Sequence, residues 1–358
     1  MLKQVQHDKD DKRMMTLKNI SLQNFRSYQK SQFTFSDNTS LIVGPNTAGK
    51  SNLIEAIYLL SFGKSFRSEK DSDMISFDKE IGRVNGSASD TELEVVLTKA
   101  PLKKFLVNGV AKRRLDFAGI LSCVLFSPLD LEIIIGSPSN RRNLLNDVLE
   151  QADQEYKRSH IDYTKALRQR NALLEKTRET GERNEKLFEY WDSLLIENGA
   201  VLTKKREEFI EFANSSQKDI CDFVMYYDKS IISKARLLQY QEAEVGAGNT
   251  LVGPHRDDFF ISLFNNTRLT THNVKTFGSR GQQRLAILQL KLLQLSFIEK
   301  AIGERPVLLL DDIFSELDEG HIELVLEMVD KQQTIMTTTH KEFFKKTFLQ
   351  AVNVIELG

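Results

Sequence analysis

At 358 residues, the chain is long enough for a large core and about two domains. Hydrophobic residues make up 41% and charged residues 28%, as in ordinary globular proteins, and no apolar run approaches the roughly 20 residues of a membrane span. The net charge of −1 excludes binding of nucleic acid by the field of the whole protein, so such binding requires local basic patches. The two cysteines, Cys123 and Cys221, indicate free thiols in a cytoplasmic protein.

The start of the chain, residues 1–14, is polar and charged and lacks the apolar core of a secretory signal. We expect a disordered or non-native leader there. Alternating apolar residues then predict strands over 16–24 and 32–36. The turn between them has the sequence N-F-R-S-Y (24–28), in which Arg26 either reaches a nucleotide or belongs to a surface turn.

A phosphate-binding loop follows, and the rest of the sequence is interpreted around it. An apolar strand (41–43) precedes G-P-N-T-A-G-K-S and a helix follows to about residue 61, which is the setting that the pattern G-x-x-x-x-G-K-[ST] requires. Backbone N–H groups of the loop and the positive end of the helix bind phosphate oxygens. We expect Lys50 to neutralise the β- and γ-phosphates of ATP and Ser51 to hold Mg²⁺. The predicted nucleotide-binding residues are Gly44, Pro45, Asn46, Thr47, Ala48, Gly49, Lys50, Ser51, Asn52 and Arg26.

Basic residues follow in two places. The basic loop G-K-S-F-R (63–67) either contacts nucleotide or DNA or is a solvent-exposed loop without a ligand, and the sequence favours neither. Strands are predicted over 92–98 and 105–107, and Asn108-Gly109 predicts a hairpin turn with a basic run just beyond it. A further apolar strand is predicted over 121–126. The candidate DNA contacts are Lys64, Arg67, Lys112, Arg113 and Arg114.

The chain becomes charged, helical and poor in glycine and proline over 139–227. We predict two long helices, about 139–177 and 184–227, with heptads too irregular for a long coiled-coil arm. Trp191 is assigned to the core. β-character is expected to return over 230–244. Four arginines are assigned to solvated helix faces, with DNA contact as the alternative: Arg141, Arg142, Arg168 and Arg170.

Two motifs follow the helical region. The sequence G-P-H-R-D-D (253–258) is explained equally well as an ion-pair cluster or as part of a nucleotide site, and a strand is predicted over 259–264. A helix from about 280 to 302 is apolar on nearly all sides, which predicts deep burial. Its start resembles the S-G-G-Q core of the ABC ATPase signature motif and forms a second phosphate-binding end. These signature residues are Ser279, Arg280, Gly281 and Gln282.

The sequence P-V-L-L-L-D-D (306–312) is a buried strand ending in carboxylates, which is the Walker B pattern. We expect Asp311 to hold Mg²⁺ together with Ser51. Asp312 stands where ABC ATPases usually have a glutamate that orients the attacking water. Because aspartate is one methylene shorter, slow turnover is predicted.

Two shorter motifs follow the Walker B strand. Ser315 and Asp318 belong to a sequence, S-E-L-D, that resembles the D-loop. A strand over 334–338 leads to His340, which stands like the switch histidine that contacts the γ-phosphate. Asp312 and His340 are therefore the predicted catalytic residues.

The order of these motifs is that of ABC ATPases, in which the signature of one subunit closes over the nucleotide of another. One chain carries one copy of each motif, so a complete site requires two chains. The order predicts an ATP-dependent homodimer with two nucleotides at a two-fold interface. The expected fold is α/β: an ABC-type ATPase head of mixed β-sheets with flanking helices and an inserted helical subdomain. The expected parts are the N-terminal ATPase segment (15–136), the insert (137–245) and the C-terminal ATPase segment (246–358).

The whole pattern resembles the RecF family of SMC-like ABC ATPases, from about residue 15 to the C-terminus. The resemblance depends on the motifs above, on F-S-P-L-D-L (126–131) and G-S-P-S-N-R-R (136–142), and above all on G-P-H-R-D-D with S-x-G-Q-Q-R. It implies ATP-driven dimerisation, weak ATPase activity, DNA binding near single-strand/duplex junctions, and cooperation with RecR and RecO in loading recombinase. Arg280 and His321 depart from the family pattern, and Ser127–Asp130 is the nearest match to a Q-loop.

Two other functions are weighed against this one. An ATP-liganded structural DNA clamp would bind nucleotide and dimerise without significant turnover. A transporter ATPase subunit would share the ATPase motifs, but the G-P-H-R-D-D segment and the helical insert argue against it. DNA-stimulated phosphate release and binding to a membrane permease, respectively, would separate these functions.

Overall fold

The computed structural model describes residues 14–99, 103–264, 271–316 and 319–358, so residues 1–13 of the expected leader lie outside it. At its centre is a five-stranded parallel sheet with the order β14-β3-β13-β12-β8. Four of these strands are buried along their whole length, because both faces of the sheet are covered. The strands are β3 (Thr39–Val43), β8 (Cys123–Phe126), β12 (Val307–Asp311), β13 (Thr334–Thr338) and β14 (Asn353–Glu356).

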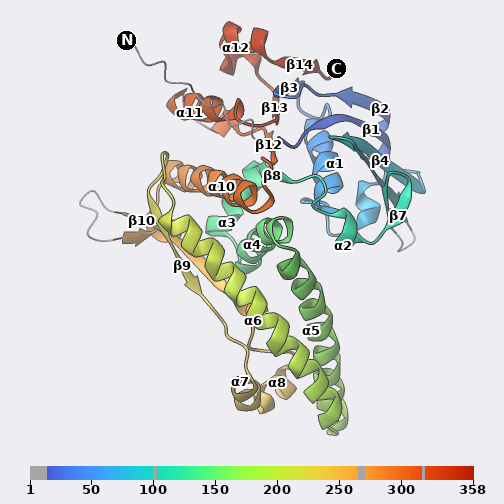
Figure 1. Cartoon of the computed structure of the whole chain (residues 1–358), viewed down its shortest axis with the longest axis vertical. Coiled ribbons are helices and arrows are strands. Elements are labelled where there is room, and N and C mark those ends of the chain that lie inside the picture. The colour runs from blue at the N-terminus through green and yellow to red at the C-terminus, as the bar shows by residue number, and fades with distance from the viewer. Residues whose placement is uncertain (1–13, 100–102, 265–270, 317–318) are drawn as a thin grey trace, which may run out of the picture.

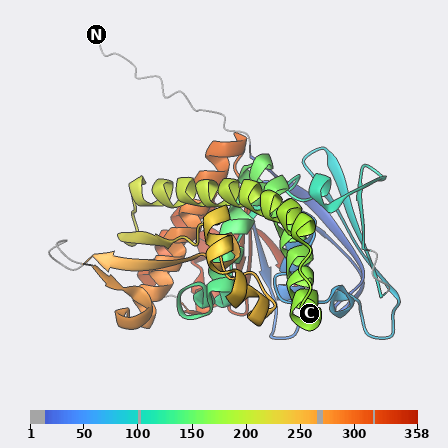
Figure 2. The same ribbon diagram turned by 90° about the horizontal axis from the view of Figure 1, so that it is seen from below.

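A six-stranded antiparallel sheet with the order β2-β1-β4-β5-β6-β7 forms the second layer. Helix α1 (Lys50–Phe62) contacts strands of both sheets, and eleven of its 13 residues are buried. This explains why the helix lacks a polar face. The antiparallel sheet lies at the right of the molecule in Figures 1 and 2. Its strands are β1 (Leu17–Phe25), β2 (Tyr28–Thr34), β4 (Ile81–Ala88), β5 (Thr91–Thr98), β6 (Lys104–Val107) and β7 (Val110–Lys112).

Strand β4 is missing from the sequence-based prediction, because it contains two glycines. The tertiary structure explains one of them: a Cβ atom on Gly86 would lie 2.7 Å from the Leu60 side chain of α1. The glycine thus permits the helix to approach the sheet. The predicted hairpin turn at Asn108-Gly109 is confirmed, with φ of 50° and 75° joining β6 to β7.

The other face of the parallel sheet carries a mainly helical lobe. Helices α5 and α6 form a long antiparallel pair that extends away from the sheets (Figure 1). A small sheet, β11-β10-β9, lies on the side opposite the antiparallel sheet in both views (Figure 2). The elements of this region are α3 (Glu132–Ile135), α4 (Pro138–Ala152), α5 (Gln154–Thr180), α6 (Glu185–Ser215), β9 (Phe223–Asp228), α7 (Lys234–Gln239), α8 (Gln241–Ala247), β10 (Asp258–Phe264), β11 (Thr271–Asn273), α9 (Val274–Phe277) and α10 (Arg280–Ile302). The short helix α2 (Arg114–Phe117) instead packs on β6 and β7 of the antiparallel sheet. The chain ends through α11 (Glu319–Val329) and α12 (Lys346–Ala351).

Three predictions about this lobe are wrong. The first long helix is broken at Asp153, whose side chain accepts a hydrogen bond from the Tyr156 N–H and caps α5. The second ends at Ser215, because residues 223–228 have alternating burial and pair with β10. Residues 230–244 are largely helical rather than β, since Ser233 caps α7. The pairing of β9 with β10 also crosses the expected boundary at 245.

Buried ion pairs hold the lobe together, and they decide the role of the G-P-H-R-D-D segment. Its two aspartates accept hydrogen bonds from arginines of α4 and α6, so the segment is a structural cluster here. The prediction of solvated faces is therefore wrong for Arg141 and Arg170, whereas Arg168 is exposed. The pairs are Arg206–Asp257 at 2.8 Å, Arg141–Asp258 at 2.5 Å and Arg170–Glu244 at 2.7 Å.

The same segment predicts acid sensitivity. His255 lies between the Tyr163 hydroxyl (2.7 Å) and the Thr250 carbonyl (3.0 Å), and burial lowers its pKa to about 4. The folded protein therefore holds fewer protons here than the unfolded chain, and stability is lost as pH falls from 6.5 toward 4. In wild-type protein we expect the free energy of unfolding to fall by on the order of 2 kcal/mol across this pH range. His255→Gln should remove most of that fall, as measured by denaturant unfolding at several pH values. An unchanged pH profile in the variant would contradict the assignment.

Candidate nucleotide-binding site

The phosphate loop lies between β3 and α1, as predicted. Lys50 is the first residue of α1 and is 6% exposed. Its Nζ donates to the Gly44 and Pro45 carbonyls at 2.8 and 2.9 Å, so the side chain folds over the loop. Burial lowers the pKa of Lys50, while Asp312 and Asp311 oppose that shift. The ammonium group is thus desolvated and directed at the space that the loop encloses.

Ser51 and Asp311 are brought together although 260 positions separate them. The Ser51 hydroxyl donates to Asp311 Oδ1 at 3.0 Å, and the Thr337 hydroxyl donates to the same oxygen at 2.8 Å. Burial raises the pKa of Asp311, which has no ion-pair partner among the described residues. A buried carboxylate beside a serine hydroxyl is a donor set that suits a hard divalent cation, and the role of Ser51 and Asp311 as Mg²⁺ ligands stays a prediction.

This arrangement predicts that the Asp311 carboxylate lowers the stability of the nucleotide-free protein while it supports Mg²⁺-dependent binding of ATP. Because the folded-state pKa of Asp311 is raised, its charged form destabilises the folded protein above that pKa. We expect Asp311→Asn to raise the melting temperature of the nucleotide-free protein by roughly 2 °C at neutral pH. The same variant should lose the Mg²⁺-dependent part of its ATP affinity. A lower melting temperature with unchanged Mg²⁺ dependence would refute both parts.

The predicted catalytic residues lie at the carboxyl ends of adjacent strands. Asp312 follows β12 with a strained φ of 51°, and its N–H donates to Thr337 Oγ1 at 3.0 Å. His340 follows β13, and 61% of its side chain is exposed beside Glu342. In the parallel sheet β13 lies between β3 and β12, so both residues emerge at the edge where the phosphate loop begins. Ser315 donates to the Asp312 carbonyl at 3.1 Å, whereas Asp318 lies outside the described residues.

The signature segment forms an exposed helix start. Ser279 caps α10, accepting from the Gln282 N–H at 3.2 Å and donating its own N–H to the Gln282 side chain at 2.9 Å. Ser279 to Gln282 are exposed, and burial begins at Gln283. Within the described residues, no hydrogen bond or ion pair joins this segment to the phosphate loop of the same chain. The buried helix predicted over 280–302 is confirmed.

The structure gives Arg26 partners other than the predicted nucleotide. Its guanidinium donates to Glu55 at 2.8 and 2.7 Å, to Ser68 and to the Asp73 carbonyl. Glu55 is missing from the predicted site, although an acidic residue on an otherwise apolar helix is a signal for a buried ion pair. Ser27 accepts from the Asn52 amide at 3.0 Å. The N-F-R-S-Y turn therefore contacts α1, the helix that follows the phosphate loop, through Glu55 and Asn52.

The candidate DNA contacts have mixed surroundings. Lys64 pairs with Asp147 at 2.5 Å, and Arg67 donates to Asn52 at 3.2 Å, which places Arg67 beside the phosphate loop. Lys112 is exposed at the end of β7. The remaining two have protein partners: Arg113 pairs with Asp116, and Arg114 contacts the Phe62 carbonyl and Glu150.

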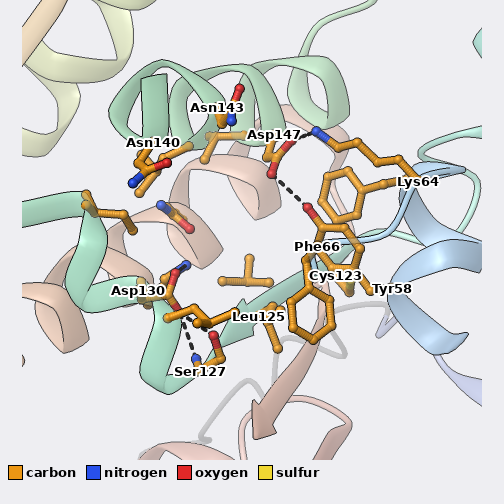
Figure 3. Close-up of a pocket in the computed structure, with 18 of the residues that line it drawn as sticks. Tyr58, Lys64, Phe66, Cys123, Leu125, Ser127, Asp130, Asn140, Asn143 and Asp147 are labelled. Atoms are coloured by element: carbon orange, nitrogen blue, oxygen red, sulfur yellow. Dashed lines mark hydrogen bonds and ion pairs between the residues drawn. The ribbon is translucent and has the colours of Figure 1, made fainter. Parts of the chain in front are cut away.

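A cavity of about 690 Å³ lies between α1, β8, α4 and α10 (Figure 3). Tyr58 donates to Asp147 at 2.7 Å on one side, and Asp130 caps the turn at Ser127 on the other. Asp130 also pairs with Lys291 of α10 at 2.6 Å. No residue of the phosphate loop lines this cavity, so it is separate from the nucleotide site. The Ser127–Asp130 segment follows β8, lines this cavity and contacts α10.

The sheets, the phosphate loop and the exposed signature helix define an ABC-type P-loop ATPase of the SMC class. The family model described as RecF/RecN/SMC N terminal domain matches residues 16–356. The chain belongs to the RecF family. It is 37% identical to the DNA replication and repair protein RecF of Exiguobacterium and 34% identical to that of Bacillus cereus, in each case over 96% of this chain and 97% of the relative.

Solved structures agree with this assignment. The structure of the recombination mediator protein RecF-ATP in the RecFOR pathway matches with a TM-score of 0.86 and 33% identity, over 95% of this chain and 96% of that one. A RecF-ATPrS structure matches with a TM-score of 0.85 and 32% identity, over 97% of both chains. The Smc head of Pyrococcus furiosus, at 18% identity and a TM-score of 0.51, shares the fold. Of the helices that the structure describes, none has the length and apolar character to cross a membrane.

Proposed function

We propose that this chain is an ATP-dependent DNA-binding protein of recombinational gap repair, which dimerises on DNA near single-strand/duplex junctions. The relatives are DNA replication and repair proteins, and one solved relative is a recombination mediator with ATP. One observation carries the proposal: the chain holds a phosphate loop with its Ser51–Asp311 pair and an exposed signature helix that do not contact each other. Two such chains, related by a two-fold axis, complete two nucleotide sites.

Each residue has a role in this scheme. Lys50 and the loop N–H groups bind the phosphates, Ser51 and Asp311 hold Mg²⁺, and Ser279 with Gly281 bind the partner's nucleotide. When it is bound, Mg²⁺ would act as a Lewis acid that stabilises negative charge on the phosphate oxygens. Asp312 orients the attacking water, and His340 contacts the γ-phosphate. Hydrolysis then separates the two chains and releases DNA, and RecR and RecO act with the protein in loading recombinase.

The dimer is tested by Asp312→Asn. An amide cannot accept a proton from water, so ATP should persist and hold the two chains together. We expect Asp312→Asn to elute as a dimer with Mg-ATP and as a monomer without it, in size-exclusion chromatography with light scattering. Wild-type protein, with and without a gapped duplex, is the reference. A monomer in ATP under all conditions would overturn the proposed function.

A clamp without turnover remains the second function, because Asp312 replaces the usual glutamate and the Asp312 backbone is strained. Single-turnover phosphate release distinguishes the two. If a gapped duplex accelerates phosphate release, the result supports the hydrolytic switch. Dimerisation with no release above background supports the clamp.

A further inference from the structure

A buried carboxylate lies at the middle of the helix that carries the phosphate loop. Glu55 is 0% exposed, although the residues around it on α1 are mostly apolar. Its two oxygens accept from Arg26 Nε at 2.8 Å, from Arg26 Nη2 at 2.7 Å and from the Ser65 hydroxyl at 2.5 Å. A buried charge is costly unless it is paired in this way, and an unpaired Arg26 or Glu55 would destabilise its surroundings.

Arg26 extends this contact to a second segment of chain. It has a left-handed backbone, with φ of 52°, and its N–H donates to the Met74 carbonyl at 2.8 Å. Its guanidinium also donates to Ser68 Oγ and to the Asp73 carbonyl, each at 2.5 Å. One planar, bidentate side chain thus ties the turn at 24–28 and the segment at 68–74 to α1.

Ser65 connects the same carboxylate to Arg67. The Ser65 hydroxyl donates to Glu55 and accepts from the backbone N–H groups of Arg67 and Ser68, both at 2.9 Å. Arg67 in turn donates to Asn52, the residue after Ser51, at 3.2 Å. Because Asn52 follows Ser51, the exposed Arg67 guanidinium lies at the end of the phosphate loop that carries Ser51.

We propose that Arg26 and Glu55 are a positioning pair, which holds the loop 63–68 so that Arg67 contacts the terminal phosphate of bound ATP. This inference rests on the proposed function, since it requires a nucleotide in the loop. The pair does not touch the nucleotide. It acts through Ser65, whose hydroxyl fixes the backbone of Arg67, and a fixed loop loses less entropy when the phosphate binds.

The test is a double-mutant cycle on nucleotide preference. ATP and ADP affinities of the full chain are measured with Mg²⁺ by titration calorimetry at a concentration where the protein is monomeric. ADP lacks the terminal phosphate, so the ratio of the two affinities reports the Arg67 contact. We expect Arg67→Ala and Glu55→Gln each to lower the ratio about 10-fold, and the double variant to lower it no further. A ratio that falls about 100-fold in the double variant would overturn the inference.

A purely stabilising role gives different results. It would lower the melting temperature of Glu55→Gln and leave the ratio at the wild-type value, which overturns the inference. Ser65→Ala keeps the Arg26–Glu55 pair and provides a milder variant if Glu55→Gln does not fold; it should lower the ratio in the wild-type background but not in Arg67→Ala. Glu94→Gln, which breaks the Arg83–Glu94 pair (2.7 Å) in the antiparallel sheet, is the control and should keep the ratio. Wild-type protein that binds no ATP refutes the proposed function itself.

Discussion

Lys50→Met is expected to reduce ATP affinity at least about 100-fold, the largest loss of binding that we predict. The Nζ atom lies against the Gly44 and Pro45 carbonyls and is nearly enclosed, so its charge acts on phosphate with little screening by water. Methionine keeps much of the length and volume of the side chain and removes the charge together with the N–H donors to Gly44 and Pro45. Fluorescence titration with a labelled ATP measures the effect.

Unfolding would not explain that loss. The pKa of Lys50 is lowered by burial, so its charged form is unfavourable in the folded protein, and Lys50→Met should keep or raise the melting temperature. Lys30→Met, at an exposed position of β2, is the matched control and should bind ATP normally. Retained affinity in Lys50→Met would remove the phosphate loop from the nucleotide site.

Ser279→Arg is expected to leave ATP binding by the monomer within about 2-fold of wild type and to abolish the ATP-dependent dimer. The exposed side chain does not contact its own phosphate loop, so its effect falls on the partner's nucleotide. A long charged side chain at the helix start would occupy the space that the partner must enter. Light scattering with Mg-ATP measures the dimer, and titration at low protein concentration measures the monomer affinity.

The substitution also removes the helix cap, which costs on the order of 1 kcal/mol. Ser279→Thr keeps the cap and a hydroxyl, and should still dimerise. A mixture of Lys50→Met with Ser279→Arg is the sharpest control. One combined site then has the intact Lys50 of one chain and the intact Ser279 of the other, so a heterodimer with a single nucleotide should form. A Ser279→Arg dimer as stable as wild type would refute the two-chain site.

Local chemistry made part of this protein predictable. The phosphate loop, the Asn108-Gly109 turn and the α10 start each depend on contacts within a few residues. Their positions in the structure agree with the prediction. The motif order also indicated the RecF family, because widely spaced motifs in one order are far more specific than any one alone.

Long-range packing decided the rest. The Ser51–Asp311 contact joins positions 260 apart, and only the adjacency of β3, β13 and β12 brings them together. Strand β4 forms in spite of its glycines, and residues 230–244 are helical where β-structure was predicted, since neighbours override weak local preferences. Arg26 precedes the phosphate-loop strand in sequence, so either contact with a nucleotide or a place in a surface turn is expected from sequence alone. Only the tertiary structure shows its partner Glu55, since a carboxylate buried on α1 must be paired within the protein.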